Sequence, residues 1–200
     1  MIRFAPLLAL SLALAGPAVA AGPVDPDWPC IQRRQPQLSL AQVWGGPELA
    51  PDLEARAETP RIRQLAQLLA QRRVTLDEAR AHIAAFAKDA PPEDLPALFL
   101  ATFERIQSAR NQVMAGITLY AHKQEVLDAE IKSLRQEFST LMAVEEKDFD
   151  AINKVEETID WSTRIFLDRQ QSLTYVCETP VILEQRIFAL GRIIEAQMKQ

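Results

Sequence analysis

Proline and glycine are nearly absent from the middle of this chain. Pro96 and Pro180 are separated by 83 residues that contain no proline and a single glycine, Gly116. Both residue types interrupt helices, so their scarcity permits very long ones. Apolar residues recur here at alternating steps of three and four, which keeps them on one side of an α-helix. The positions of this seam are Phe99, Thr102, Ile106, Ala109, Val113, Ile117, Tyr120, Gln124, Leu127, Ile131, Leu134, Phe138 and Leu141.

A seam of this length has to be buried against a partner helix, from this chain or from another. Residues 144–148 are its most polar interruption, and apolar spacing resumes beyond them. We therefore predict an all-α helical bundle with a long antiparallel coiled-coil-like hairpin over about residues 94–177. Its arms, residues 94–142 and 146–177, would be unequal, at about 70 Å and about 48 Å. A single unbroken helix is the alternative. The predicted interaction seam is Ile131, Leu134, Phe138 and Leu141.

Helix-start signals mark three further helices. Thr59-Pro60 combines an N-cap residue with proline at the first helical position, and we expect that helix to reach about Arg73. Thr75 followed by Glu78 predicts a capping box and a helix ending near residue 89. Thr179-Pro180 repeats the first signal and predicts a separate last helix. That helix should bury Ile182 or Leu183, together with Ile187, Leu190 and Ile194.

The N-terminal residues are typical of an export signal. Arg3 precedes an apolar run from Phe4 to Ala15, and Ala18-Val19-Ala20 forms a small-x-small cleavage pattern. We predict a signal peptide over residues 1–20, cut after Ala20, and a periplasmic protein with no membrane span after cleavage. Residues 21–58 contain six of the thirteen prolines, which predicts an extended Pro/Trp-rich arm before a helical domain at residues 59–200.

Cys30 and Cys177 are the two cysteines, and both follow the predicted cleavage point. In an oxidising compartment such a pair is expected to form a disulfide. It would close a loop of nearly 150 residues, for which chain entropy gives about 5 kcal/mol of stabilisation.

The chain lacks the patterns of common reactive sites. His82 and His122 are not preceded by the Glu-x-x-His spacing of helical di-iron sites, and no C-x-x-C, P-loop or G-x-S-x-G pattern occurs. We therefore predict no catalytic, cofactor-binding or metal-binding residues. The formal net charge of -5 argues against nucleic acid as a partner. The acidity is uneven: residues 125–160 carry eleven acids against four bases, whereas residues 61–123 carry nine bases against six acids.

One enzymatic alternative rests on a resemblance. Residues 65–73, Leu-Ala-Gln-Leu-Leu-Ala-Gln-Arg-Arg, are similar to the leucine-rich first helix of the chorismate mutases. The resemblance implies a small secreted all-helical enzyme that uses arginine, lysine and glutamate side chains inside a bundle. It covers nine residues, and Val74-Thr75 stands where that family would continue its helix.

The long seam, the acidic segment and the absence of a catalytic pattern together predict binding rather than catalysis. We expect an exported periplasmic interaction or scaffold protein that works through a coiled-coil surface. Its partner would be a protein of the cell envelope or a second copy of the same chain.

Overall fold

The computed structural model describes Asp25 and residues 27–199, and every regular element in that part of the chain is a helix. The predicted signal peptide and its cleavage after Ala20 lie outside the described residues, as does the beginning of the predicted arm.

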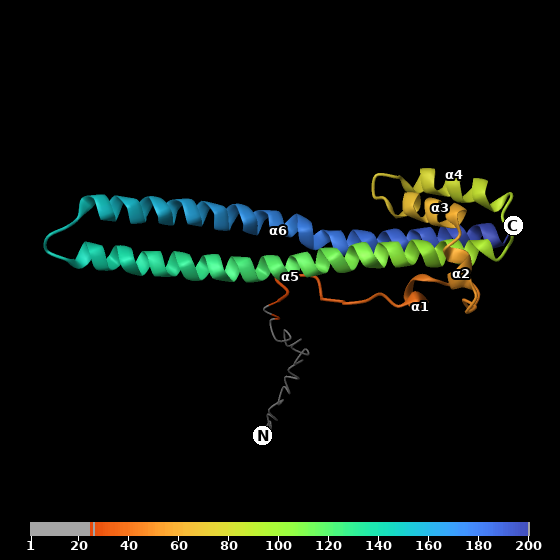
Figure 1. Cartoon of the computed structure of the whole chain (residues 1–200), viewed down its shortest axis with the longest axis horizontal. Helices are drawn as coiled ribbons and strands as arrows, with labels where there is room; N and C mark the ends of the chain where they lie inside the picture. The colour runs from red at the N-terminus through yellow and green to blue at the C-terminus, as the bar shows by residue number, and fades with distance from the viewer. Residues whose placement is uncertain (1–24, 26, 200) are drawn as a thin grey trace, which may run out of the picture.

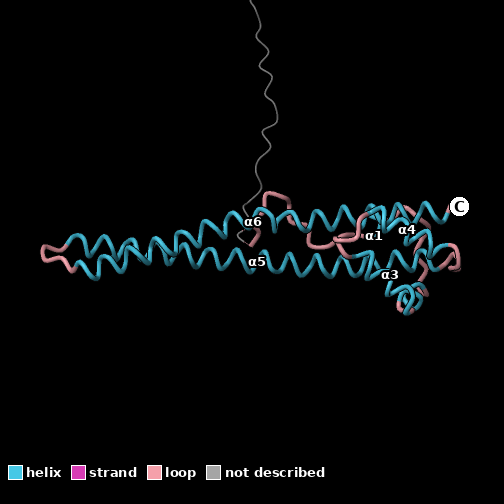
Figure 2. Tube along the Cα trace, turned by 90° about the horizontal axis from the view of Figure 1, so that it is seen from above, coloured by secondary structure: helices cyan, strands magenta, loops and turns pink. Residues whose placement is uncertain are grey.

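Two long antiparallel helices dominate the molecule (Figures 1 and 2). They are α5 (Asp94–Ala143) and α6 (Phe149–Met198), each of 50 residues and therefore about 75 Å long. The chain turns between them at residues 144–148, where the polar interruption of the seam predicts it. Asp148 caps α6, because its side chain accepts hydrogen bonds from the backbone N–H groups of Asp150 and Ala151 at 3.1 and 3.0 Å.

The expectation of a separate last helix is wrong. Pro180 lies inside α6, which continues from the hairpin turn to Met198. Proline removes one backbone hydrogen bond and crowds the preceding turn, and α6 bends about midway along its length instead of ending (Figure 1). The two arms are therefore equal, not unequal as predicted. The predicted inward face beyond Pro180 is buried at Leu183, Ile187, Leu190 and Ile194, whereas Ile182 is exposed.

Four short helices surround one end of this hairpin. They are α1 (Leu40–Val43), α2 (Leu53–Ala57), α3 (Pro60–Ala70) and α4 (Leu76–Ala87). The helix start at Pro60 and the capping box before α4 are confirmed: Thr75 Oγ1 accepts from the Glu78 N–H at 3.2 Å, and Glu78 Oε2 accepts from the Thr75 N–H at 2.8 Å. Helix α2 lies in the segment predicted to be extended, and it packs on α5. Helices α1–α4 and the adjoining ends of α5 and α6 are called the head below.

The main hydrophobic core lies in the head. Its buried side chains come from all six helices, and Trp44 stacks on Phe99 with ring centroids 4.3 Å apart. Gly191 permits close contact between α6 and the segment around α1, because a Cβ atom there would lie 2.6 Å from the Val43 carbonyl oxygen. Arg186 is buried in the same region and donates through Nε to the Leu69 carbonyl at the end of α3, at 2.8 Å. Burial lowers the pKa of Arg186, and the negative end of α3 favours the charge that remains.

Candidate interaction surface

An N-terminal strap, defined as residues 27–39, runs along both long helices from the middle of the hairpin to the head (Figure 1). Cys30 in the strap and Cys177 in α6 form the predicted disulfide, with S–S and Cα–Cα distances of 2.03 and 5.5 Å. The disulfide fastens the far end of the strap to α6. It marks the boundary between the half of the hairpin that the head and strap support and the half that extends beyond them.

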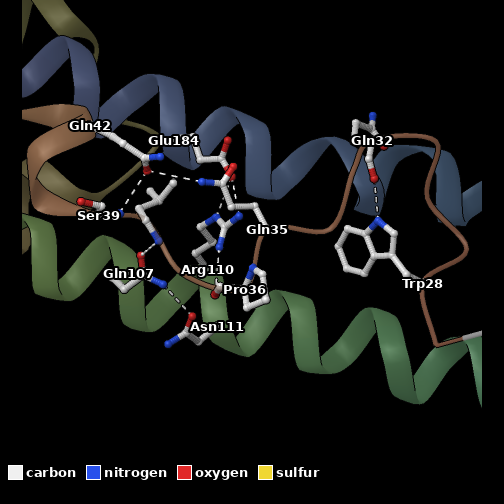
Figure 3. A network of polar contacts seen from close by, with 11 residues as sticks. Trp28, Gln32, Gln35, Pro36, Ser39, Gln42, Gln107, Arg110, Asn111 and Glu184 are labelled. Atoms are coloured by element: carbon white, nitrogen blue, oxygen red, sulfur yellow. Dashed lines mark hydrogen bonds and ion pairs between the residues drawn. The ribbon is translucent and has the colours of Figure 1, made fainter. Parts of the chain in front are cut away.

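The same end of the strap is also held on α5. Trp28 is buried against Met114 and Ile117, and its ring nitrogen donates to the Gln32 carbonyl at 2.6 Å (Figure 3). Asp27 contacts His122 Nε2 at 2.5 Å. This hydrogen bond, reinforced by the nearby carboxylate charge of Asp27, raises the pKa of His122 above its ordinary value of 6.5. The contact with Asp27 therefore favours the protonated form of His122.

A buried ion pair joins the strap to both helices nearer the head (Figure 3). Arg110 of α5 is 1% exposed. Its Nε and Nη2 atoms donate to Glu184 Oε1 of α6 at 2.8 and 2.5 Å, and its Nη1 atom donates to the Pro36 carbonyl of the strap at 3.2 Å. A buried charge requires such partners. The sequence did not reveal this site, because the register that places Glu184 opposite Arg110 cannot be read from either helix alone.

The predicted seam residues lie on the side of α5 that is turned toward α6. Ile131 is buried, and Leu134, Phe138 and Leu141 are half-buried. Beyond the strap only α6 runs beside α5 (Figure 2), so α6 accounts for this burial. Within the chain the seam is therefore occupied by α6, and any surface offered to another molecule has to lie elsewhere on the hairpin.

The seam also contains polar atoms that the fold leaves without a partner. Tyr120 Oη, Gln124 Oε1 and Thr163 Oγ1 are buried between the two long helices and have no hydrogen-bond partner among the described residues. Burial raises the pKa of Tyr120. Each such atom costs about 1–3 kcal/mol, so these three atoms reduce the stability of this part of the hairpin.

Beyond the strap, the distal hairpin (residues 123–172) exposes large apolar side chains. Trp161 is 64% exposed and Phe149 is 68% exposed, and Tyr175 at the edge of this region is 69% exposed. Further exposed apolar side chains in and beside this half are Leu119, Val126, Met142, Val144, Leu167 and Val176. The acid-rich segment 125–160 forms most of the same half. Apolar and acidic side chains are therefore presented together on a projecting rod.

The segment that resembles the chorismate mutases does not place its charged side chains inside the bundle. Helix α3 ends at Ala70, so Arg72 and Arg73 lie exposed in the turn before α4. In the described part of the chain, no three histidine, cysteine, aspartate or glutamate side chains are grouped to hold a metal ion. Nor is any described helix both long and apolar enough to cross a membrane.

Comparisons of this chain with protein-family models, with curated proteins and with solved structures give no match.

Proposed function

We propose that the chain is an exported periplasmic interaction or scaffold protein whose distal hairpin binds a protein of the cell envelope or a second copy of itself. The observation that carries this proposal is the exposure of Trp161, Phe149 and Tyr175 on a two-helix rod that projects from the head. Tryptophan and tyrosine contribute disproportionately to protein–protein binding energy.

The division of the molecule into a head and a projecting distal hairpin supports the same proposal. The head contains the main core and is held to the hairpin by the strap, the disulfide and the Arg110–Glu184 pair. The distal hairpin has none of these supports among the described residues, and it extends the surface of the molecule away from the main core. An element of that kind is favoured in a protein that contacts others at a distance from its own core.

Export is supported by the disulfide and by the signal pattern at residues 1–20. Disulfides persist in oxidising compartments such as the periplasm and are rare in the cytosol. We infer that the fastening of the strap to α6 depends on that environment.

Photo-cross-linking in the native host tests this function. A cross-linking amino acid is placed at Trp161 in the distal hairpin, with a control at Arg72 in the exposed turn of the head. We expect an adduct with a specific protein, or with a second copy, from position 161 and none from position 72. Equal adducts at both positions, or none at either, would remove the support for the hairpin as a binding element. A chain that forms no adduct but turns over a small molecule would favour the enzymatic alternative.

A further inference from the structure

The outer face of α6 carries two exposed aromatic residues in register. Trp161 and Tyr175 are 14 residues apart, which is close to four helical turns and about 21 Å along the axis. They therefore lie on the same side of α6. That side is opposite the one whose Ile152, Val155 and Cys177 side chains are buried toward α5 and the strap.

Two charges of opposite sign lie between these aromatic residues on the same face. Arg164 and Asp168 are exposed and one helical turn apart. Among the described residues, neither side chain forms an ion pair or a hydrogen bond. The face thus contains an unpaired cation, an unpaired anion and an aromatic residue toward each end.

This arrangement is self-complementary. If a second α6 lies antiparallel on the first, with the twofold axis between positions 164 and 168, each Arg164 faces Asp168 of the other copy. In the same arrangement each Trp161 lies against the other copy of α6, on the helical turn that immediately precedes Tyr175. A twofold interface uses the same surface patch on both subunits, so every contact occurs twice.

We propose that the outer face of α6, centred on residues 161–175, binds the same face of a second copy of this chain to form an antiparallel dimer. This inference rests on the proposed function, because it names the partner of the hairpin. Tryptophan, tyrosine and arginine are the residue types that dominate binding hot spots, and the face supplies one of each. The reciprocal charge pairs fix the antiparallel direction and the register.

The first test is the mass of the exported chain in solution over a range of concentrations, by sedimentation or light scattering. We expect a dimer that dissociates on dilution. Trp161→Ala and Tyr175→Ala should each weaken dimerisation at least about tenfold. Leu119→Ala is the matched control, because Leu119 is 57% exposed on α5, away from this face, and it should leave the dimerisation constant unchanged. Helix content by circular dichroism should be the same for all variants, since these are surface positions.

A charge exchange tests the register. Arg164→Asp alone and Asp168→Arg alone each place like charges opposite one another and should weaken the dimer. The double variant restores opposite charges at both pairs and should recover it. Failure of the double variant to recover would overturn the proposal, as would a wild-type chain that stays monomeric at every concentration. A monomer that still cross-links to a different protein through position 161 would overturn only the second-copy proposal, whereas a monomer without any adduct would overturn the proposed function as well.

Discussion

Removing Glu184 and removing Arg110 should lower the stability of the fold by different amounts. The Arg110 side chain is 2% exposed, and that of Glu184 is 29% exposed. Glu184→Ala leaves the guanidinium buried with only the Pro36 carbonyl, at 3.2 Å, as an acceptor. We expect a loss of about 3 kcal/mol, at the low end of the range for breaking a buried pair, because Glu184 is partly solvated. Arg110→Met removes the buried charge itself and lets Glu184 turn to water, so it should cost only about 1 kcal/mol.

Urea unfolding followed by circular dichroism measures both values, with the disulfide intact throughout. Arg110→Met combined with Glu184→Leu should be no less stable than Arg110→Met alone, since apolar replacements of a buried pair are often neutral. Equal losses for the two single variants, or a larger loss for Arg110→Met, would refute the reasoning that the uncompensated cation dominates the cost.

Four further substitutions probe other parts of the fold. Cys177→Ser should lower the stability by up to about 5 kcal/mol, and the wild-type chain should show no free thiol after denaturation; two reactive thiols per chain would contradict the disulfide. Because the contact with Asp27 raises the pKa of His122, its stabilisation should be present at pH 5 and be lost as the pH rises through that raised pKa. The pH dependence of the melting temperature should therefore become smaller in His122→Gln, and an identical profile would argue against the contact. Gly116→Ala should stabilise the chain by about 0.5–1 kcal/mol, because a Cβ there meets nothing within 4 Å, whereas Gly191→Ala should destabilise it through the clash with Val43. Calorimetry that shows Gly191→Ala to be stabilising would contradict the placement of α6 against Val43, and a destabilising Gly116→Ala would contradict the open space at that position.

The local features of the fold could be predicted from the sequence because short-range chemistry determines them. The seam spacing, the polar turn at residues 144–148 and the reciprocal bonds of Thr75 and Glu78 all depend on residues within one or two helical turns. Pro180 shows where that reasoning fails. The same Thr-Pro pair that starts α3 at Pro60 is accommodated inside α6, since the surrounding packing on α5 continues on both sides of it. Helix α2 was missed because five residues between two prolines carry little periodicity.

The candidate surface could be predicted only in part. The sequence predicts the seam through Ile131 and Leu134 but allows a partner from this chain or another, and in the structure α6 covers it. The exposed face with Trp161 and Tyr175 was not found, because an exposed aromatic residue looks the same in sequence as a buried one. Their spacing of 14 residues was the available signal, and it becomes informative only once the inward face of α6 is known.

Two equal 50-residue helices form a rod that projects beyond the head. Small-angle X-ray scattering of the chain, extrapolated to low concentration, measures the length of this rod. We expect a maximum dimension of at least about 75 Å, the length of either helix. A chain of this size packed as a compact bundle would have a radius of gyration near 16 Å and a maximum dimension of about 40 Å. The compact values would contradict the projecting hairpin and the binding function proposed for it.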